Sequence, residues 1–117
     1  MVISFGDRIL RAVVERCREY LRVFDLIGRY GGEEFLLVLP ETNDAEALGV
    51  AERLRRTIEH MRVPVGENEI AVTVSLGVAV MTPAITNLTM LIEHADHALY
   101  LAKQAGRNCV RQYNESL

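Results

Sequence analysis

The sequence has few of the features that direct a chain to a membrane, a metal or an oxidising compartment. It contains only two cysteines, Cys17 and Cys109, and their spacing fits neither a metal site nor a disulfide framework. Both fit the pattern of small buried hydrophobic residues in a reducing environment. No apolar run reaches membrane-spanning length, and the first residues do not resemble a secretory signal. We therefore expect a soluble, cytoplasmic chain without a membrane segment.

A basic excess is absent as well. The chain carries 13 lysines and arginines against 16 aspartates and glutamates, which gives a formal net charge of −3. Proteins that bind nucleic acid over a broad face usually have a basic excess, and RNA binders often add exposed aromatic residues for stacking. We therefore expect no nucleic-acid partner. A small phosphorylated ligand stays compatible with this charge, because a few arginines and backbone amides can bind it locally.

The chain has 117 residues, half of them hydrophobic, with no repeat or internal linker, so residues 1–117 are predicted to form one domain. Apolar residues recur at helical spacing in three segments and alternate with small residues in one long strand. Apolar runs on either side of two glycines predict a hairpin, since glycine accepts the positive φ of tight turns. The predicted elements are a helix over 6–21, a hairpin over 25–39, a helix over 43–61, a strand over 70–80, a helix over 89–105 and a short strand over 108–113.

Capping residues set the predicted ends of two helices. Asn43 can accept a hydrogen bond at the start of the second helix, and Glu46 is placed to complete a capping box with it. Thr89 is the predicted N-cap of the last helix, and Gly106 its predicted C′ residue.

This order of elements indicates an α+β class, with helices on one side of a mostly antiparallel sheet. A strand ahead of the first helix would complete a ferredoxin-like βαββαβ core. Only five residues, 1–5, precede Gly6. The prediction is therefore a ferredoxin-like sheet with helices that lacks the usual first strand.

The tract Gly31-Gly32-Glu33-Glu34-Phe35 allows two interpretations. Taken alone, it favours a plain hairpin with solvated glutamates. The other interpretation is a nucleotide site, because glycines let the backbone approach a phosphate or a purine closely. A carboxylate at such a turn can also hold Mg²⁺ together with substrate phosphates.

The surrounding sequence decides between them. Gly6-Asp7 opens the first helix, Arg22-Val23-Phe24-Asp25 precedes the glycines, and Lys103 and Arg107 lie four residues apart near the end of the last helix, where they would share a face. These tracts, with Val74-Ser75-Leu76-Gly77-Val78 and the run from Ala95 to Asn108, closely resemble the GGDEF domain family. The resemblance covers nearly the whole chain, from about Gly6 to Asn108. It implies the nucleotidyl cyclase palm-type fold.

The resemblance also implies an activity. GGDEF enzymes are diguanylate cyclases, nucleotidyltransferases that join two GTP molecules into cyclic di-GMP, a bacterial second messenger in signal transduction, and release two pyrophosphates. Each domain holds one GTP, and the 3′-hydroxyl of each GTP attacks the α-phosphate of the other. The implied partners are GTP, cyclic di-GMP and a second copy of the domain in a homodimer. The implied cofactor is Mg²⁺ or Mn²⁺.

Site residues are implied position by position. Glu33 and Glu34 match the catalytic acidic positions, Glu33 being the metal ligand and Glu34 lying close to the nucleotide. Substrate binding is implied for Asp7 at the guanine edge, for Gly31 and Gly32 against GTP, and for Lys103 and Arg107 at the terminal phosphates. Read singly, each residue has a plainer role; Asp7, for example, could simply cap a helix.

An inhibitory product site is implied as well. Arg22 and Asp25 match the family's Arg-x-x-Asp tract, and Arg53 matches an arginine on the next helix that completes the site in a partner domain. A planar guanidinium suits bidentate contacts to guanine or phosphate. The plainer alternative is a surface ion pair between Arg22 and Asp25 worth under ~1 kcal/mol.

The start of the sequence departs from the family. Val2-Ile3 stands in place of Gly-His, and the family's first metal-binding Asp, its Phe-Lys segment and its guanine-binding Asn have no counterpart. We expect a GGDEF domain missing its N-terminal strand and loop, and inactive alone. The alternative is a non-catalytic module that binds cyclic di-GMP or GTP or mediates dimerisation.

The missing strand also implies a gap in the sheet, with unpaired backbone groups on both sides of it. Three outcomes would fill the gap. The sheet could close up, Val2-Ile3-Ser4 could substitute as a strand, or another chain could donate one. We expect pairing between chains, in a dimer.

Overall fold

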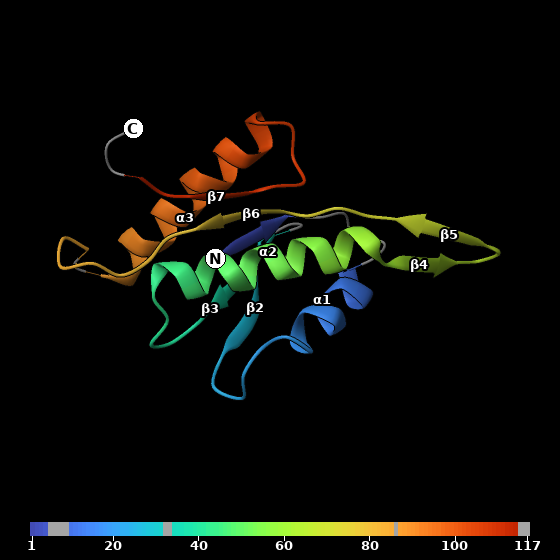
Figure 1. The fold of residues 1–117 in the computed structure, drawn as a ribbon, viewed down its shortest axis with the longest axis horizontal. Coiled ribbons are helices and arrows are strands. Elements are labelled where there is room, and N and C mark those ends of the chain that lie inside the picture. Colours follow the sequence, from blue (N-terminus) through green and yellow to red (C-terminus); the bar gives the residue numbers. More distant parts are fainter. Residues whose placement is uncertain (5–9, 32–33, 86, 115–117) are drawn as a thin grey trace.

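The computed structural model describes residues 1–4, 10–31, 34–85 and 87–114 (Figure 1). Within these ranges, no helix has both the length and the apolar character needed to cross a membrane. The elements in chain order are β1 (Val2–Ser4), α1 (Leu10–Arg18), β2 (Leu26–Gly31), β3 (Glu34–Val38), α2 (Asp44–His60), β4 (Arg62–Val65), β5 (Asn68–Ala71), β6 (Ser75–Val78), α3 (Leu88–Gln104) and β7 (Val110–Gln112).

The main sheet has five strands in the order β2-β3-β1-β6-β7. Strand β1 runs antiparallel to both β3 and β6, and β7 runs parallel to β6 at one edge. Strands β1, β2, β3 and β6 with helices α1 and α2 form the predicted ferredoxin-like βαββαβ core. The α+β prediction and the hairpin between 25 and 39 are therefore confirmed in the described part of the chain.

The expected gap in the sheet is not confirmed. Val2 pairs with Leu36 on one side and with Gly77 on the other, and its side chain is fully buried. Met1 extends the ladder, since its carbonyl accepts from the Leu37 N–H at 2.8 Å. Three extended residues are enough to fill the place between β3 and β6, because both of these strands are short. Each residue of β1 pairs with one residue of β3 and with one residue of β6. The sheet therefore does not require a strand from another chain.

The prediction that helices cover one side of the sheet is wrong. Helices α1 and α2 pack on one face, whose buried residues include Phe35, Leu37 and Leu76. Helix α3 packs on the other face, against Val2 and Leu36. Because side chains alternate along a strand, β1 and β3 present apolar residues to both faces, and both faces need a cover.

A second hairpin replaces much of the predicted long strand. The strand predicted over 70–80 is split: Ile70 belongs to β5, and β6 covers only Ser75–Val78. Strands β4 and β5 pair with each other around a turn at Gly66, where φ is +62°, and project from the body of the domain (Figure 1). The alternation of apolar residues continues across 70–80 although the hydrogen-bonding partner changes, so the sequence pattern could not reveal the break.

Most predicted helix ends are confirmed. Asn43 and Glu46 form the predicted capping box at the start of α2. Gly106 follows the last helix with a φ of +108°, as expected of a C′ glycine. The start of α3 differs from the prediction, because its N-cap is Asn87, whose side chain accepts from the Met90 N–H at 2.8 Å, and not Thr89. The predicted first helix is confirmed over Leu10–Arg18, and its expected start lies outside the described residues.

Gly77 sets the distance between α3 and the sheet. A Cβ built on Gly77 would lie 2.1 Å from the Ala95 carbonyl oxygen and 2.3 Å from the Leu99 nitrogen. Both atoms belong to the backbone of α3, so they cannot move aside as the end of a flexible side chain can. Ala95 and Leu99 are themselves buried, which leaves the helix no room to shift sideways.

We predict opposite effects for two glycine-to-alanine substitutions. Gly77→Ala should lower the free energy of unfolding by about 3 kcal/mol or more, because the added methyl group overpacks a backbone contact. Gly49→Ala is the matched control: Gly49 lies exposed in α2, and a Cβ there meets nothing within 4 Å. It should raise the stability by about 0.5–1 kcal/mol through helix propensity. Urea unfolding followed by circular dichroism measures both, and equal stabilities would contradict the close packing.

The buried amino terminus predicts a pH dependence for the 117-residue chain. Burial lowers the pKa of the Met1 α-amino group from 8.0 to about 6, and this group donates to the Leu37 carbonyl at 3.0 Å. Between these two pKa values the unfolded chain binds more protons than the folded chain. The free energy of unfolding should therefore rise as pH increases from about 6 to 8, by roughly 2–3 kcal/mol at most.

Acetylation of the Met1 amine provides the control, because it removes the titrating group and keeps an N–H donor. Urea unfolding across this pH range should show the rise in the free chain and a flatter profile in the acetylated one. Mass spectrometry establishes that Met1 is retained. Identical pH profiles for the two forms would show that the amine is not buried in the fold.

Candidate functional site

The described residues of the predicted glycine-glutamate tract lie at the end of the β2–β3 hairpin where the two strands are connected. Gly31 ends β2 and Glu34 begins β3, while Gly32, Glu33 and Asp7 lie outside the described residues. Gly31 is exposed, its φ is not positive, and a Cβ there meets nothing within 4 Å. Neither packing nor backbone conformation therefore requires glycine at this position, unlike at Gly77.

Glu34 faces Lys103 at this end of the sheet. The Lys103 Nζ lies 3.9 Å from a carboxylate oxygen of Glu34, and both side chains are about three-quarters covered, with 25% and 26% of their surface exposed. The two residues come from β3 and from the last turn of α3. The structure thus brings together one predicted acidic residue and one predicted phosphate-binding residue that are far apart in the sequence.

Arg107 lies beyond the helix and not on it. Helix α3 ends at Gln104, so the predicted helical face shared by Lys103 and Arg107 is wrong. The Gly106 N–H bonds the Lys103 carbonyl, and the Arg107 N–H bonds the Ala102 carbonyl, a pair that forms a Schellman motif. Because these N–H groups are occupied, an anion near this turn would be held by the Lys103 and Arg107 side chains.

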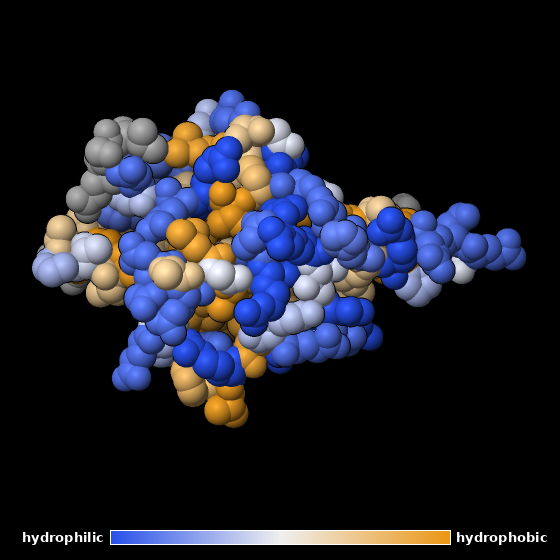
Figure 2. Space-filling model, viewed as in Figure 1, coloured by the Kyte–Doolittle hydropathy of each residue, from blue (hydrophilic) through white to orange (hydrophobic). Residues whose placement is uncertain are grey.

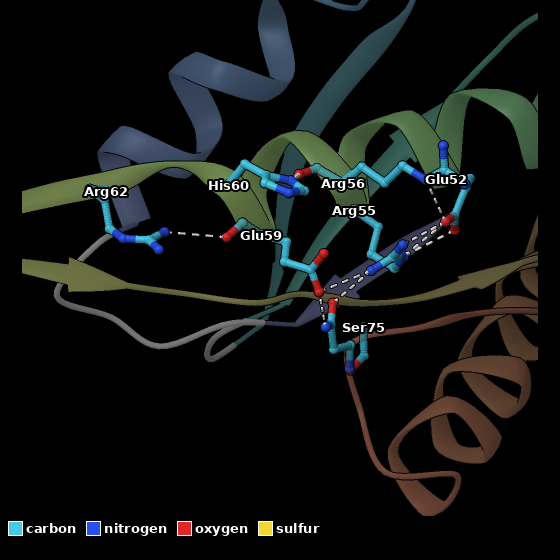
Figure 3. Close-up of polar contacts among 8 residues, drawn as sticks. Glu52, Arg55, Arg56, Glu59, His60, Arg62 and Ser75 are labelled. Atoms are coloured by element: carbon cyan, nitrogen blue, oxygen red, sulfur yellow. Dashed lines mark hydrogen bonds and ion pairs between the residues drawn. The ribbon is translucent and has the colours of Figure 1, made fainter.

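A polar network that the sequence did not indicate supports the same turn. Arg55 on α2 bonds both carboxylate oxygens of Glu52, at 2.6–3.1 Å, and reaches the Asn108 side-chain oxygen at 3.1 Å (Figure 3). The Asn108 amide in turn donates to Glu59, and the Asn108 backbone N–H donates to the Ser75 hydroxyl at 3.2 Å. The i, i+3 and i, i+4 spacing of Glu52, Arg55 and Glu59 was visible in the sequence, but their contact with Asn108 was not.

Arg22 and Asp25 form a tightly bonded turn ahead of β2. The Arg22 guanidinium donates to both carboxylate oxygens of Asp25, with Nη2 to Oδ1 at 3.0 Å and Nε to Oδ2 at 3.1 Å. The Arg22 backbone N–H adds a third bond to Asp25, at 2.7 Å. Burial acts to raise the pKa of Asp25, but the hydrogen bonds from Arg22 outweigh it and lower that pKa.

The Arg22 guanidinium is fixed on further sides. It lies over the Phe24 ring at 4.6 Å and donates to the Pro40 carbonyl at 3.1 Å and the Thr42 hydroxyl at 2.7 Å. Val23 and Phe24 are exposed in the same turn, where Figure 2 shows apolar atoms at the lower tip of the molecule. Arg53 lies exposed on α2, apart from these contacts. The plain surface ion pair considered from the sequence is therefore too simple a description of Arg22.

Of the two predicted catalytic carboxylates, the structure describes Glu34, while Glu33, the predicted metal ligand, lies outside the described residues. Within the described part of the chain, no three residues among His, Cys, Asp and Glu gather closely enough to hold a metal ion. Glu34 fits a role beside a hard cation, because its carboxylate is partly covered and lies 3.9 Å from the Lys103 ammonium group.

An apolar cavity lies elsewhere on the molecule. This cavity of about 420 Å³ opens at the other end of β3, between that strand and the start of α3, with Leu39, Val80 and Leu91 among its lining residues. None of the predicted site residues lines it. Glu34 and Lys103 lie at the opposite end of β3 from this cavity.

Comparisons with known proteins agree with this arrangement. The sequence profile of the family described as "Diguanylate cyclase, GGDEF domain" matches residues 3–109. The chain is 41% identical over 113 residues to diguanylate cyclase DosC of Escherichia coli, and 38% identical over 109 residues to the response regulator PleD of Caulobacter vibrioides. The matches cover 96% and 92% of this chain but 24% of each relative, so the chain spans about a quarter of their length.

A solved structure extends the match to three dimensions. The GGDEF domain of DgcB from Caulobacter crescentus, in complex with c-di-GMP, superposes with a TM-score of 0.86 at 26% identity, and the match covers 96% of this chain and 75% of that one. The observed fold and the family profile agree. The chain belongs to the GGDEF family of diguanylate cyclase domains.

Proposed function

We propose that this domain forms one half of a diguanylate cyclase active site, in which it binds one GTP and a second copy of the domain supplies the other. The observation that carries this proposal is the approach of Lys103 to Glu34 beside Gly31, since it places a cation and a carboxylate together at one end of the sheet. A nucleoside triphosphate and its metal need both charges there. In this arrangement the 3′-hydroxyl of each GTP attacks the α-phosphate of the other, and pyrophosphate leaves.

The two basic side chains would bind the terminal phosphates. Lys103 contributes a compact ammonium group, and Arg107 a planar guanidinium that suits two phosphate oxygens at once. The Schellman hydrogen bonds occupy the backbone N–H groups of Gly106 and Arg107, so the side chains supply the attraction. They also offset the partial negative charge of the α3 C-terminus, which would otherwise disfavour an anion.

The carboxylates would hold the metal. Glu34 and its neighbour Glu33 are two carboxylates next to the place proposed for the phosphates, and Mg²⁺ or Mn²⁺ is usually held by one or two carboxylates together with substrate phosphates. The bound cation would neutralise charge on the phosphoryl oxygens. At 3.9 Å, the contact between Lys103 and Glu34 is loose, so Lys103 can turn to a phosphate when the metal takes its place beside Glu34.

The glycines would leave room for the nucleotide. The space above Gly31 is open within 4 Å of where a side chain would begin, so a purine or phosphate can lie directly on the backbone there. By family resemblance, Gly32 would share this role and Asp7 would accept hydrogen bonds from the guanine edge.

The Arg22-Asp25 turn would bind cyclic di-GMP as an inhibitor. Asp25 holds the guanidinium over the Phe24 ring before any ligand arrives, which reduces the entropy lost on binding. The Nη1 group makes none of the hydrogen bonds that fix Arg22, so it can donate to a guanine or phosphate oxygen. Arg53, exposed on α2, would complete this site on a partner domain.

A second candidate function is that of a non-catalytic module that binds GTP or cyclic di-GMP or mediates dimerisation. The observation that favours it concerns β1, the central strand, whose residues Val2–Ser4 include no carboxylate. The family resemblance places a metal-binding Asp on that strand. The two candidates differ in turnover, because the second forms no cyclic di-GMP.

We predict that the 117-residue chain binds GTP in the presence of Mg²⁺ but forms cyclic di-GMP at less than about one-hundredth of the rate of a complete GGDEF enzyme assayed beside it. Loss of one metal carboxylate removes several kcal/mol of transition-state stabilisation. Calorimetry measures binding, and chromatography measures product. Failure of the folded chain to bind GTP would refute the proposed function, whereas turnover near the full rate would refute the expected inactivity.

We predict that Arg22→Ala weakens cyclic di-GMP binding by about tenfold or more, which corresponds to roughly 1.4 kcal/mol for a lost charge-assisted contact. Arg111→Ala is the matched control, because Arg111 is exposed on β7, at the opposite edge of the sheet from β2. Calorimetric titration gives both affinities. If the two substitutions have the same effect, the Arg22 turn is not the binding site.

A further inference from the structure

The turn after α3 holds an uncommon backbone conformation. Arg107 and Asn108 both have left-handed φ values, +65° and +45°, directly after Gly106 at +108°. Asparagine tolerates this region, but arginine seldom adopts it, and each such residue strains the backbone. Two in succession persist only where the surrounding structure holds them.

Two backbone hydrogen bonds fix the two ends of this strained pair. The Arg107 N–H bonds the Ala102 carbonyl at 3.1 Å, and the Asn108 N–H bonds the Ser75 hydroxyl at 3.2 Å. Ser75 is the buried polar residue of β6, with 3% of its surface exposed, so it provides a rigid anchor in the sheet.

The Asn108 side chain adds a third anchor, on α2. Its oxygen accepts from Arg55, and its amide donates to Glu59. Arg55 is only 15% exposed and is itself held by three hydrogen bonds to Glu52. The hydrogen bond from Asn108, followed by the charge of Arg55, lowers the pKa of Glu59, so this carboxylate is ionised and a full acceptor at neutral pH.

These anchors determine where the Arg107 side chain begins. The guanidinium of Arg107 is exposed, and within the described residues no hydrogen bond or ion pair engages it. The left-handed backbone at 107 and 108 sets the direction in which this long side chain leaves the turn. Without Asn108, the turn can relax to an ordinary φ, which would direct Arg107 elsewhere.

We propose that Asn108, held by Arg55 and Glu59, is a positioning residue that presets Arg107 for the polyphosphate of the bound nucleotide. The proposal rests on the proposed function, because it deepens the role of the same phosphate-binding edge. Asn108 does not touch the nucleotide; it acts through Arg107. Loss of Asn108 therefore weakens binding of a triphosphate and leaves binding of the nucleoside part unchanged.

The test compares GTP with guanosine, each titrated into ¹⁵N-labelled chain with Mg²⁺ and followed by NMR. Asn108→Gly removes the side-chain amide but keeps the freedom to adopt left-handed φ. It should weaken GTP binding by about five- to tenfold, as expected for a lost preset contact of roughly 1 kcal/mol, with guanosine binding unchanged. Arg56→Ala is the matched control on the same helix, because Arg56 bonds Glu52 and not Asn108, and it should change neither affinity.

A double-mutant cycle separates positioning from a general structural effect. Arg107→Ala should weaken GTP binding at least as much as Asn108→Gly, and adding Asn108→Gly to Arg107→Ala should cause little further loss. Additive losses, or equal losses for GTP and guanosine, would overturn the inference. Wild-type chain that binds no GTP while folded would instead refute the proposed function, and this inference with it.

Thermal unfolding of each variant checks that the fold is retained. If Asn108→Gly unfolds, Glu59→Ala takes its place in the cycle, since it removes one of the two side-chain partners of Asn108 and keeps a good helix former in α2. Its loss of GTP affinity should again disappear in the Arg107→Ala background. A loss that persists there would overturn the inference.

Discussion

The contact between Gly77 and the backbone of α3 is the constraint on which the rest of the site depends. It lets the helix lie closer to the sheet than any side chain at that position would allow, and the buried alanines Ala95, Ala98 and Ala102 continue the close approach along the helix. Lys103 is the residue after Ala102, and its side chain approaches Glu34 at the end of the sheet. A helix held farther away would leave the cation and the carboxylate too far apart to share one ligand.

The central strand shows how little chain a sheet needs when both neighbours are already in place. Strand β1 has three residues, yet it pairs on both sides and buries Val2 completely. Its brevity has a chemical consequence, because these three residues bring no carboxylate to the middle of the sheet. The fold and the chemistry of the domain therefore depend differently on this segment: the fold needs its backbone, and the reaction would need its side chains.

Local signals in the sequence predicted local structure well. The capping box at Asn43 and the terminal Gly106 were predictable because their hydrogen bonds join residues close in sequence. The split of the strand over 70–80 was not, since Ile70 keeps the same alternation while its partner changes from the main sheet to β4. The anchoring of Asn108 by Arg55 was also hidden, because it joins residues 53 positions apart that no periodicity connects.

The projecting β4–β5 hairpin has a consequence for how the domain can be modified. Its strands pair only with each other in the described structure, its turn at Gly66 is exposed, and Figure 2 shows a mostly hydrophilic surface over it. Backbone at such a tip supports no core contact, so opening it costs little of the global stability. The turn from Gly66 to Asn68 is therefore a natural insertion point for a fluorescent reporter or an affinity tag, one that leaves the five-stranded sheet and its phosphate-binding edge unchanged.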